Sequence, residues 1–527
     1  MKKEKGSTRH ILESEGNFKY VLIMEGLACG LLAGLIAIIY RLLLGYAEQF
    51  IAFMASVIWD NLLYIIGWFL FLLVLGVLIG WCLKQEPLIS GSGIPQVEGE
   101  IISFLDQKWY KILPYKIVAG TLCAFGGLSL GREGPSIQLG AMGGKGMSRI
   151  FHRVKMEEKL LLTCGAAAGL SAAFNASLAG VMFALEEVHK NFSVSVLVSV
   201  MCASVTGDFL SQYVFGLEPA FHFVVTETLP LGYYGSILLL GIICGLCGVL
   251  YNKMTLKFQD WYEKVPRLKA HYRVLIPLMI AGVLMLILPE VLGSGHTMIE
   301  MLSGKEPLLL KTLILLLVVK FIFSLASFGS GAPGGIFFPL LVLGSFVGAI
   351  YGLIAIQYFQ IPEMYLANFI IMAMAAFFAA IVRAPITGII LIAEMSGTLT
   401  HLLPLALVSL CAYLTANILN CDPIYESLLH KLLWKNGVNL DAFQGKKHIV
   451  EAAIEIGSEV CEKKVSDIAW PGKCLIISIH RGNAEIIPKG DTVLFTGDTL
   501  MALINDEDAP YVQHALEKLC TSITHFN

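Results

Sequence analysis

Apolar residues form long runs from about Phe18 to Asn420, and these runs are broken mainly by glycine and proline. They lack the strict apolar/polar alternation of barrel strands, so the pattern predicts helices. Only helices or closed barrels satisfy their backbone groups in lipid, and the fold class predicted is therefore an all-α polytopic membrane protein. Composition agrees, since 56% of the 527 residues are hydrophobic and 15% are charged, whereas a soluble protein has about a quarter charged.

Charged residues gather at the N-terminus and in one internal segment. The opening stretch MKKEKGSTRHILESEGNFKY is charged for too long to be a cleaved signal, so residues 1–17 are predicted to be cytoplasmic. The basic residues 252–273 are predicted on the same side. A formal net charge of −3 gives no indication of a nucleic-acid partner.

The cysteines offer no cofactor chemistry. Twelve are scattered along the chain, and Cys244 and Cys247 form a C-x-x-C inside an apolar helix, without a second pair or a histidine partner. Buried small residues are favoured over redox or metal work. We expect no metal site and no cofactor.

Three landmarks of the first half return in the second. GSGIPQVEGEIIS at 91 is echoed by GSGHTMIEMLSG at 293, GREGP at 131 by GSGAP at 329, and FNASLAGVMFALEE at 174 by VRAPITGIILIAEM at 382, with offsets of 202, 198 and 208. This order predicts a duplicated unit of about 200 residues.

Several apolar segments are also short for a membrane span, which takes about 20 residues. KIVAGTLCAFGG, SIQLGAMGG and PITGIILIAEM are each nearer half that length. Short, Gly/Pro-interrupted segments at matching places in two halves are typical of transporters, whose broken helices meet at a binding site near the midplane. Ordinary kinked structural helices are the alternative, but they do not require paired breaks.

The glycine turns suit an anion. GSGIP, GREGP and GSGAPGGIFFP each place glycines just before a predicted helix start. A helix N-terminus leaves N–H groups free and carries about half a positive charge, so several converging ends bind an anion without a full cation. Ser92 adds a hydroxyl at one such end; a simple N-cap is its alternative role.

Comparison of the two halves separates the acids. Aligning GREGP on GSGAP places Glu133 opposite a glycine, so the duplicated backbone needs no carboxylate there. Aligning FALEE on LIAEM places Glu186 opposite Glu394 and Glu187 opposite a methionine. Intramembrane acids are costly and by default mark ion or proton paths. Glu133 and Glu187 are therefore the functional candidates, whereas Glu186 and Glu394 fit structural helix-end roles.

The motifs GSGIP (91–95), GREGP (131–135) and GGIFFP (334–339), followed by Tyr425, resemble the CLC family of chloride channels and proton-coupled chloride exchangers. The resemblance implies a transmembrane domain over residues 18–435, with two inverted repeats at about 20–215 and 230–420. It also implies a homodimer in a bacterial cell membrane, with one anion pathway in each subunit.

Roles follow from the resemblance position by position. Ser92 and Tyr425 would supply hydroxyls to a central chloride, and the backbone amides of Ile336 and Phe337 would complete the site. The intact GREGP and the presence of Ser92 favour chloride over nitrate or fluoride.

Glu133 would be the gating glutamate, which competes with chloride as a carboxylate and swings out when protonated. Glu187 matches the intracellular proton-transfer glutamate, which channel members usually lack. With both acids present, the resemblance implies a Cl⁻/H⁺ antiporter.

The tail has a different pattern. A linker (436–446) precedes residues 447–527, where HIVEAAIEI, CLIISIH, AEIIP, DTVLF and TLMALIN read as strands and DAPYVQHALEKL as a helix. The segment resembles a TrkA-C (RCK C-terminal) domain, here expected to be cytoplasmic. In some such domains an Arg and apolar residues, near the equivalents of Arg481, Ile486 and Ile487, bind cyclic di-AMP. A domain that only strengthens the dimer is the alternative.

Three other classes of function remain to be separated. The main alternative is a passive, ligand-gated chloride channel of the same fold. An intramembrane enzyme using Glu186, Glu187 and His189 lacks a recognised metal spacing or a nucleophile–base pair. A nucleotide receptor that has lost transport is disfavoured by the intact Glu133.

Overall fold

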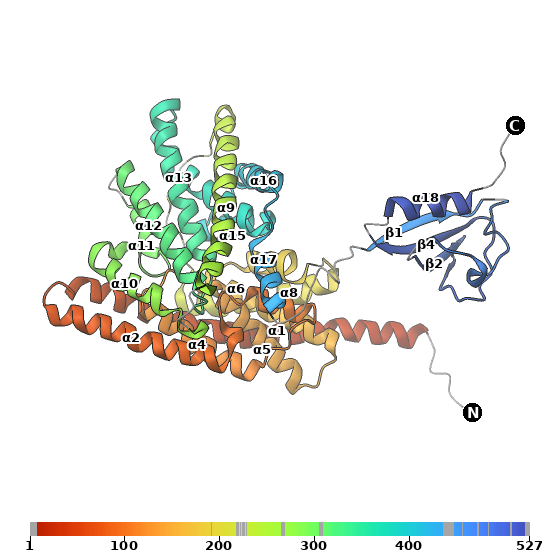
Figure 1. The fold of residues 1–527 in the computed structure, drawn as a ribbon, viewed down its shortest axis with the longest axis horizontal. Coiled ribbons are helices and arrows are strands. Elements are labelled where there is room, and N and C mark those ends of the chain that lie inside the picture. The colour runs from red at the N-terminus through yellow and green to blue at the C-terminus, as the bar shows by residue number, and fades with distance from the viewer. Residues whose placement is uncertain are drawn as a thin grey trace. The chain divides into compact units, whose positions relative to one another are not determined.

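The computed structural model describes residues 8–435, except 191, 218–220, 222, 224–226, 228, 265–268 and 305–308, and residues 447–521, except 456, 472–473, 483 and 506–508. The chain divides into two compact units, Met1–Lys431 and Leu432–Asn527, and both are drawn in Figure 1. The linker 436–446 lies outside the described residues. Each unit is described by itself below.

The first unit is helical throughout its described part. Eight of its described helical segments are long and apolar enough to span a membrane. The helices are α1 (Thr8–Val57), α2 (Leu62–Gln85), α3 (Ile94–Ile101), α4 (Trp109–Phe125), α5 (Glu133–Ile150), α6 (Lys155–Phe174), α7 (Ser177–Phe183), α8 (Val194–Phe215), α9 (Tyr234–Glu263), α10 (Leu275–Ile287), α11 (His296–Ser303), α12 (Leu310–Gly329), α13 (Phe337–Phe359), α14 (Leu366–Val382), α15 (Pro385–Ser396), α16 (Leu402–Ile418) and α17 (Ile424–Lys435), with a π-helical segment η2 (Ala184–His189) after α7.

Helix lengths correct part of the sequence prediction. α15 is short, at 12 residues, but α4 and α5 reach 17 and 18 residues and are not half-length. The glycines of α5 do not break the helix. They serve instead to let α5 approach α6 closely. A side chain at Gly140 would collide with the carbonyl oxygen of Gly165, and one at Gly165 with that of Gly140. The shortest helices are α3, α7 and α11, with 8, 7 and 8 residues.

The helix ends confirm the duplicated unit. α3 and α11 begin 202 positions apart, each after a left-handed glycine, Gly93 (φ 96°) and Gly295 (φ 107°). α7 and α15 begin 208 positions apart. A left-handed residue ahead of a helix start favours glycine, because a Cβ there is strained. The GSG turns are therefore a backbone requirement of both halves.

Two buried lysines hold these turns in the same way, and sequence analysis missed them. The ammonium group of Lys116 donates to the carbonyls of Ile89 and Gly91 (2.8 and 2.7 Å), and Lys320 donates to those of Val291 and Gly293 (2.8 Å each). Both lysines are fully buried. Each satisfies carbonyl oxygens of an irregular turn that lipid could not hydrogen-bond.

Two contacts of α1 define the faces of the unit. Glu25 pairs with Arg153 in the α5–α6 connection, and Glu48 accepts a hydrogen bond from Ser294 ahead of α11 (2.8 Å). At 1.5 Å per residue these two glutamates lie roughly 35 Å apart along the helix, close to the thickness of a bilayer core. They mark opposite faces, called here the Arg153 face and the Glu48 face.

The second unit pairs a small antiparallel sheet with one helix (Figure 1). The strands β1 (Lys447–Ala453), β2 (Leu475–Arg481), β3 (Ala484–Ile486) and β4 (Asp498–Asn505) lie in the order β1-β4-β2-β3, and α18 (Ala509–Cys520) packs on β1. Four predicted strands and the helix are confirmed. DTVLF is not a strand: its Val493 forms only an isolated bridge with Lys464.

Candidate functional site

The starts of α5 and α13 are tied together by their backbones. Gly131 and Gly335 exchange two hydrogen bonds (N···O 2.7 and 2.8 Å), and Gly334 N–H donates to Gly91 O (3.1 Å). The three glycine turns named from the sequence therefore meet at one point. Their glycines permit this approach, since a Cβ on Gly335 would lie 3.1 Å from the backbone nitrogen of Gly134.

These helix starts carry free N–H groups. Their N-cap residues are Gly93 for α3, Arg132 for α5 and Ile336 for α13, and no side chain from the described part of the chain caps any of them. Unpaired first-turn amides give each start partial positive charge. The arrangement favours a small anion.

The N-cap reading of Ser92 is wrong. Gly93, not Ser92, is the N-cap of α3, and the Ser92 hydroxyl has no hydrogen-bond partner among the described residues although it is buried. It lies against α5, because a side chain at Gly134 would collide with it. A buried, unpartnered hydroxyl is rare in folded proteins and points to a ligand.

Tyr425, at the start of α17, brings a second such hydroxyl. Its side chain is fully buried, and its hydroxyl is also unpartnered within the described ranges. Its electrostatic neighbours include Glu187, Glu133 and Ser92. The phenol thus lies between the two candidate acids and beside the serine.

Glu133 is the first residue of α5 and is fully buried. Its Oε2 and the backbone nitrogen of Phe338 both lie beside Gly131, and the carboxylate interacts with that N–H. Neither carboxylate oxygen makes a hydrogen bond of normal geometry to the described residues. A carboxylate at two paired helix starts occupies the place where an anion is best stabilised.

Glu187 lies in η2, toward the Arg153 face. It is 5% exposed, its Oε1 is unpartnered in the described structure, and its electrostatic neighbours are Glu98, Lys190 and Glu426. Lys190 also pairs with Glu98. A buried acid thus lies next to partly exposed charged groups.

Glu186 and Glu394 are structural acids, as predicted. Glu186 Oε2 accepts from the backbone N–H of Thr387 (2.8 Å) at the start of α15, and Glu394 Oε2 accepts from that of Ala179 (2.8 Å) at the start of α7. Each half thereby caps a short helix of the other half. Of the four acids compared between the halves, Glu133 and Glu187 therefore cap no helix within the described chain.

The alignment of GREGP on GSGAP is wrong in register. α5 begins at Glu133 and α13 at Phe337, 204 positions apart, which places GREGP on GIFFP. The same offset relates Gly131 to Gly335 and Lys116 to Lys320, and this repeated spacing is the signal that could have corrected the alignment. In this corrected alignment Glu133 corresponds to Phe337 and not to a glycine. The carboxylate is therefore still present in one half only.

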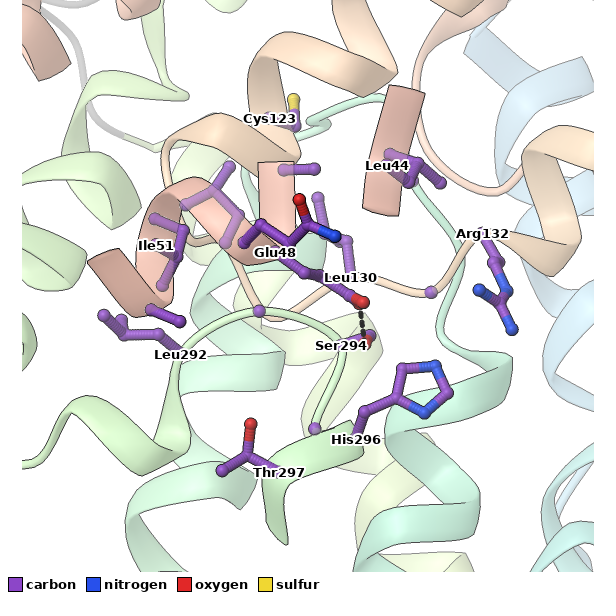
Figure 2. Close-up of a pocket in the computed structure, with 18 of the residues that line it drawn as sticks. Leu44, Glu48, Ile51, Cys123, Leu130, Arg132, Leu292, Ser294, His296 and Thr297 are labelled. Atoms are coloured by element: carbon purple, nitrogen blue, oxygen red, sulfur yellow. Dashed lines mark hydrogen bonds between the residues drawn. The ribbon is translucent and has the colours of Figure 1, made fainter. Parts of the chain in front are cut away.

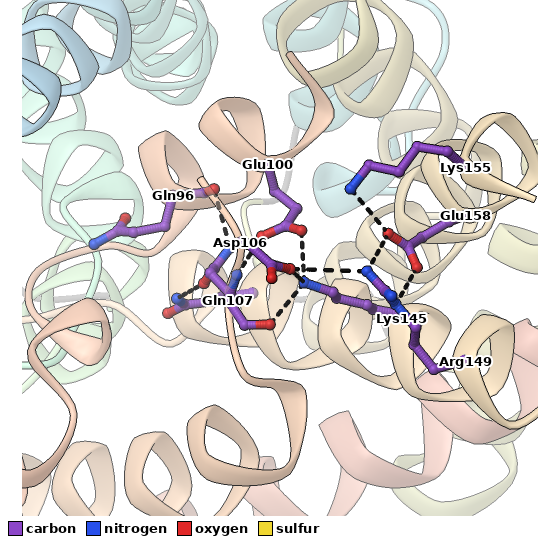
Figure 3. Close-up of polar contacts among 9 residues, drawn as sticks. Gln96, Glu100, Asp106, Gln107, Lys145, Arg149, Lys155 and Glu158 are labelled. Carbon is purple, nitrogen blue, oxygen red and sulfur yellow. Dashed lines mark hydrogen bonds and ion pairs between the residues drawn. The ribbon is translucent and has the colours of Figure 1, made fainter. Parts of the chain in front are cut away.

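A buried polar network holds α3 in place (Figure 3). Lys145 of α5 donates to Glu100 Oε1 (2.6 Å), Asp106 Oδ1 (2.7 Å) and the carbonyl of Gln107 (2.7 Å). Gln107 in turn donates to the carbonyl of Gln96 in α3 (3.0 Å). These contacts hold both halves of α3, the helix that follows Ser92 in the chain.

In the second unit Arg481 is engaged within its own sheet. Its guanidinium donates to both carboxylate oxygens of Asp498 (2.8 and 2.7 Å) and to the carbonyl of Val493 (2.8 Å), and it lies over the ring of Phe495. Ile486 is partly buried in β3, whereas Ile487 is exposed. The structure therefore gives Arg481 a structural role that sequence analysis treated only as an alternative. Over the described residues, no group of three or more His, Cys, Asp or Glu is arranged for a metal.

Fold and site together define a multi-pass membrane protein with uncapped helix starts converging between two repeats. The chain belongs to the voltage gated chloride channel family, whose model matches residues 75–417. Residues 449–516 match the TrkA-C domain.

Relatives and solved structures agree with this assignment. The chain is 36% identical over 436 residues to the H⁺/Cl⁻ exchange transporter ClcA of Vibrio cholerae (strain ATCC 39315 / El Tor Inaba N16961), covering 80% of this chain and 91% of the relative. The ClcA of Salmonella newport (strain SL254) is 35% identical over 373 residues, covering 69% and 77%. A slow cyanobacterial Cl⁻/H⁺ antiporter structure is 30% identical with a TM-score of 0.75, covering 79% of this chain and 99% of that one. A CLC-type fluoride/proton antiporter (21% identical, TM-score 0.64, covering 80% and 98%) shares the fold.

The Arg481–Asp498 pair predicts a pH dependence for the second unit. Although burial opposes ionisation, the hydrogen bonds from Arg481 and from Phe495 N–H hold the pKa of Asp498 below its usual range. A lowered folded-state pKa gives stability that is present above the ordinary Asp value of about 3.9 and is lost as pH falls through the folded value. We expect Arg481→Ala to cost about 1–3 kcal/mol at pH 7, since a buried carboxylate loses its partner, and the cost to shrink below about pH 4.

Calorimetric unfolding of the second unit within the full-length protein, at pH 7 and pH 3, measures this difference. Lys489→Ala, at an exposed turn, is the control. An Arg481→Ala cost that is equal at both pH values would contradict the assignment.

Proposed function

We propose that this protein exchanges chloride for protons across a bacterial cell membrane. The observation that carries the proposal is Glu133, a buried carboxylate without a normal hydrogen bond, at the paired and uncapped starts of α5 and α13. The names of the ClcA relatives and of the cyanobacterial structure support the same activity.

Chloride binds at the centre of this arrangement. The hydroxyls of Ser92 and Tyr425 and the backbone amides of Ile336 and Phe337 are its ligands, and all of them come from one chain. Glu133 competes for the same positive potential as a carboxylate, and it releases the site when protonated, because the neutral form loses its attraction to the helix starts. Because one chain supplies every ligand, each subunit of the proposed homodimer has its own pathway.

Protons reach Glu133 from Glu187. Glu187 neighbours Tyr425 on one side and the Glu98–Lys190 pair on the other. The proton path therefore enters from the Arg153 face and joins the anion path at the tyrosine.

The Arg153 face is proposed to be cytoplasmic. Basic side chains at this face include Arg149, Arg153 and Lys155. At the Glu48 face the acidic residues Glu48, Glu290 and Glu300 line one cavity. Loops rich in Lys and Arg stay in the cytoplasm, and the N-terminal segment and the TrkA-C domain are assigned to that side.

The TrkA-C domain is proposed to sense a small ligand such as cyclic di-AMP. Ile486 and the exposed Ile487 offer apolar contacts, and Arg481 is partly exposed, at 37% of its side chain. Arg481 is proposed to contact the ligand through the exposed part of its guanidinium while it stays bonded to Asp498.

The gating role predicts that Glu133→Gln abolishes proton coupling and leaves chloride flux nearly independent of pH, because the side chain can no longer change charge. Reconstituted protein in liposomes measures both fluxes: wild type should use an opposing pH gradient to drive chloride uphill, and the variant should not. Glu363→Gln, at an exposed carboxylate, is the control. Wild-type protein that moves chloride only downhill would establish the passive channel instead.

Substitutions of the two neighbouring acids of η2, Glu186 and Glu187, should have different effects. Glu187→Gln is expected to stop proton movement while chloride flux continues. Glu186→Gln should retain coupling and lower the melting temperature, because it weakens the cap of α15 at a cost of about 1 kcal/mol. Proton flux and thermal unfolding of both variants test this. Coupling lost in the Glu186 variant and kept in the Glu187 variant would reverse the two roles.

Ligand sensing predicts that cyclic di-AMP changes the transport rate of the full-length protein. Ile487→Asp should weaken nucleotide binding about tenfold or more, because a charge replaces an apolar contact. Isothermal titration and liposome flux, with and without nucleotide, measure the effect, and Lys489→Ala serves as the control. Transport and binding signals unaffected by nucleotide would leave the domain a dimer-strengthening role.

A further inference from the structure

A cavity of about 580 Å³ lies at the Glu48 face and reaches the turn that precedes Glu133 (Figure 2). Gly131 and Arg132, just before α5, and Pro333 and Gly334, just before α13, form part of its wall. Glu133 itself is fully buried. The cavity therefore offers a route for a proton between Glu133 and the solution at this face.

Two titratable side chains of the cavity stand between the solution and Glu133. Glu48 of α1 is exposed, and its carboxylate is held by the Ser294 hydroxyl (2.8 Å), as Figure 2 shows. His296 opens α11, and its ring packs on Phe338 with centroids 4.2 Å apart. Phe338 supplies the backbone N–H that the Glu133 carboxylate approaches. His296 is thus separated from the acid by a single residue.

Ser294 adds an internal comparison. It lies 202 positions after Ser92, in the same GSG turn of the other half. In the first half the serine hydroxyl is buried and unpartnered, whereas in the second half it holds the Glu48 carboxylate. The duplicated hydroxyl thus serves to place a titratable group instead of facing the central site.

We propose that Glu48 and His296 form the outer proton station of the exchanger, through which Glu133 exchanges its proton with the solution at the Glu48 face. This rests on the proposed exchange function. A proton from water binds the Glu48 carboxylate and passes to one ring nitrogen of His296, and the proton on the other ring nitrogen is released toward Glu133. The ring then reorients to restore its first tautomer, and the reverse sequence discharges Glu133. No bond other than those to the proton changes.

The charges around the ring suit transit. Arg41 of α1, Arg132 of α5 and Lys320 of α12 act on His296, and a proton on the ring is repelled by them and moves on to a carboxylate. Glu290, which lines the same cavity as Glu48, adds negative charge that raises the local proton concentration. Glu48 also acts electrostatically on Glu133.

The test compares Glu48→Gln and His296→Gln with wild type in oriented liposomes, using the full-length protein. Chloride-driven proton flux is measured while the pH at the Glu48 face is varied from 5 to 8 and the other side is held fixed. Each variant should slow proton exchange about a hundredfold or more at pH 7.5, the low end of what a positioned proton-transfer group contributes. The rate should return toward wild type near pH 5, where solution protonates Glu133 directly, and Glu48→Asp should keep the wild-type profile.

Glu300→Gln is the matched control, because it removes another carboxylate that lines the same cavity and leaves the Ser294–Glu48 hydrogen bond in place. Thermal unfolding of every variant must equal wild type. Wild-type protein that moves no protons would refute the exchange function itself. Coupled wild type with unchanged profiles in both variants, or an equal loss in Glu300→Gln, would overturn the proton station.

Discussion

The backbone pairing of Gly131 with Gly335 is the interaction on which the rest of the structure depends. It brings the starts of α5 and α13 together and leaves their first-turn amides unpaired within the described chain. Two partial positive charges then add at one point, and the guanidinium of Arg132, the N-cap of α5, also acts on Glu133 there. Larger residues at these glycines would force the helices apart. The positive potential that favours an anion therefore depends on the glycine turns.

Acids around this point divide according to what their oxygens bind. Glu186 and Glu394 use their carboxylates on backbone N–H groups at the starts of α15 and α7, and each links the two halves. A proton on either would cost those hydrogen bonds and loosen the scaffold. Both carboxylate oxygens of Glu133 and Oε1 of Glu187 make no hydrogen bond of normal geometry within the described chain, so a change of charge on these acids does not remove a helix cap.

Sequence patterns predicted the helical membrane class, the duplication and the acids, because glycine turns and helix caps are local features. They aligned GREGP with the wrong segment of the second half. GSGAP has a similar sequence but ends before α13, which starts at Phe337. They also missed Lys116 and Lys320, whose partners are the carbonyls of irregular turns. The Arg481–Asp498 pair was missed for a related reason: Asp498 lies on a neighbouring strand, and pairing across a sheet is not visible in a local motif.

The two halves share the residues that hold their helix starts in place and differ at several residues around the candidate site. Both have the left-handed glycine, the supporting lysine and the capping acid, and these shared parts create two sets of helix starts from one design. The differences are Glu133 against Phe337, Glu187 against Met395, and a free Ser92 against a Ser294 that holds Glu48. A strictly symmetric site would present the same groups to both faces. Exchange of two different ions needs faces that differ, and in this chain each of these three differences places or frees a carboxylate or a hydroxyl in one half only.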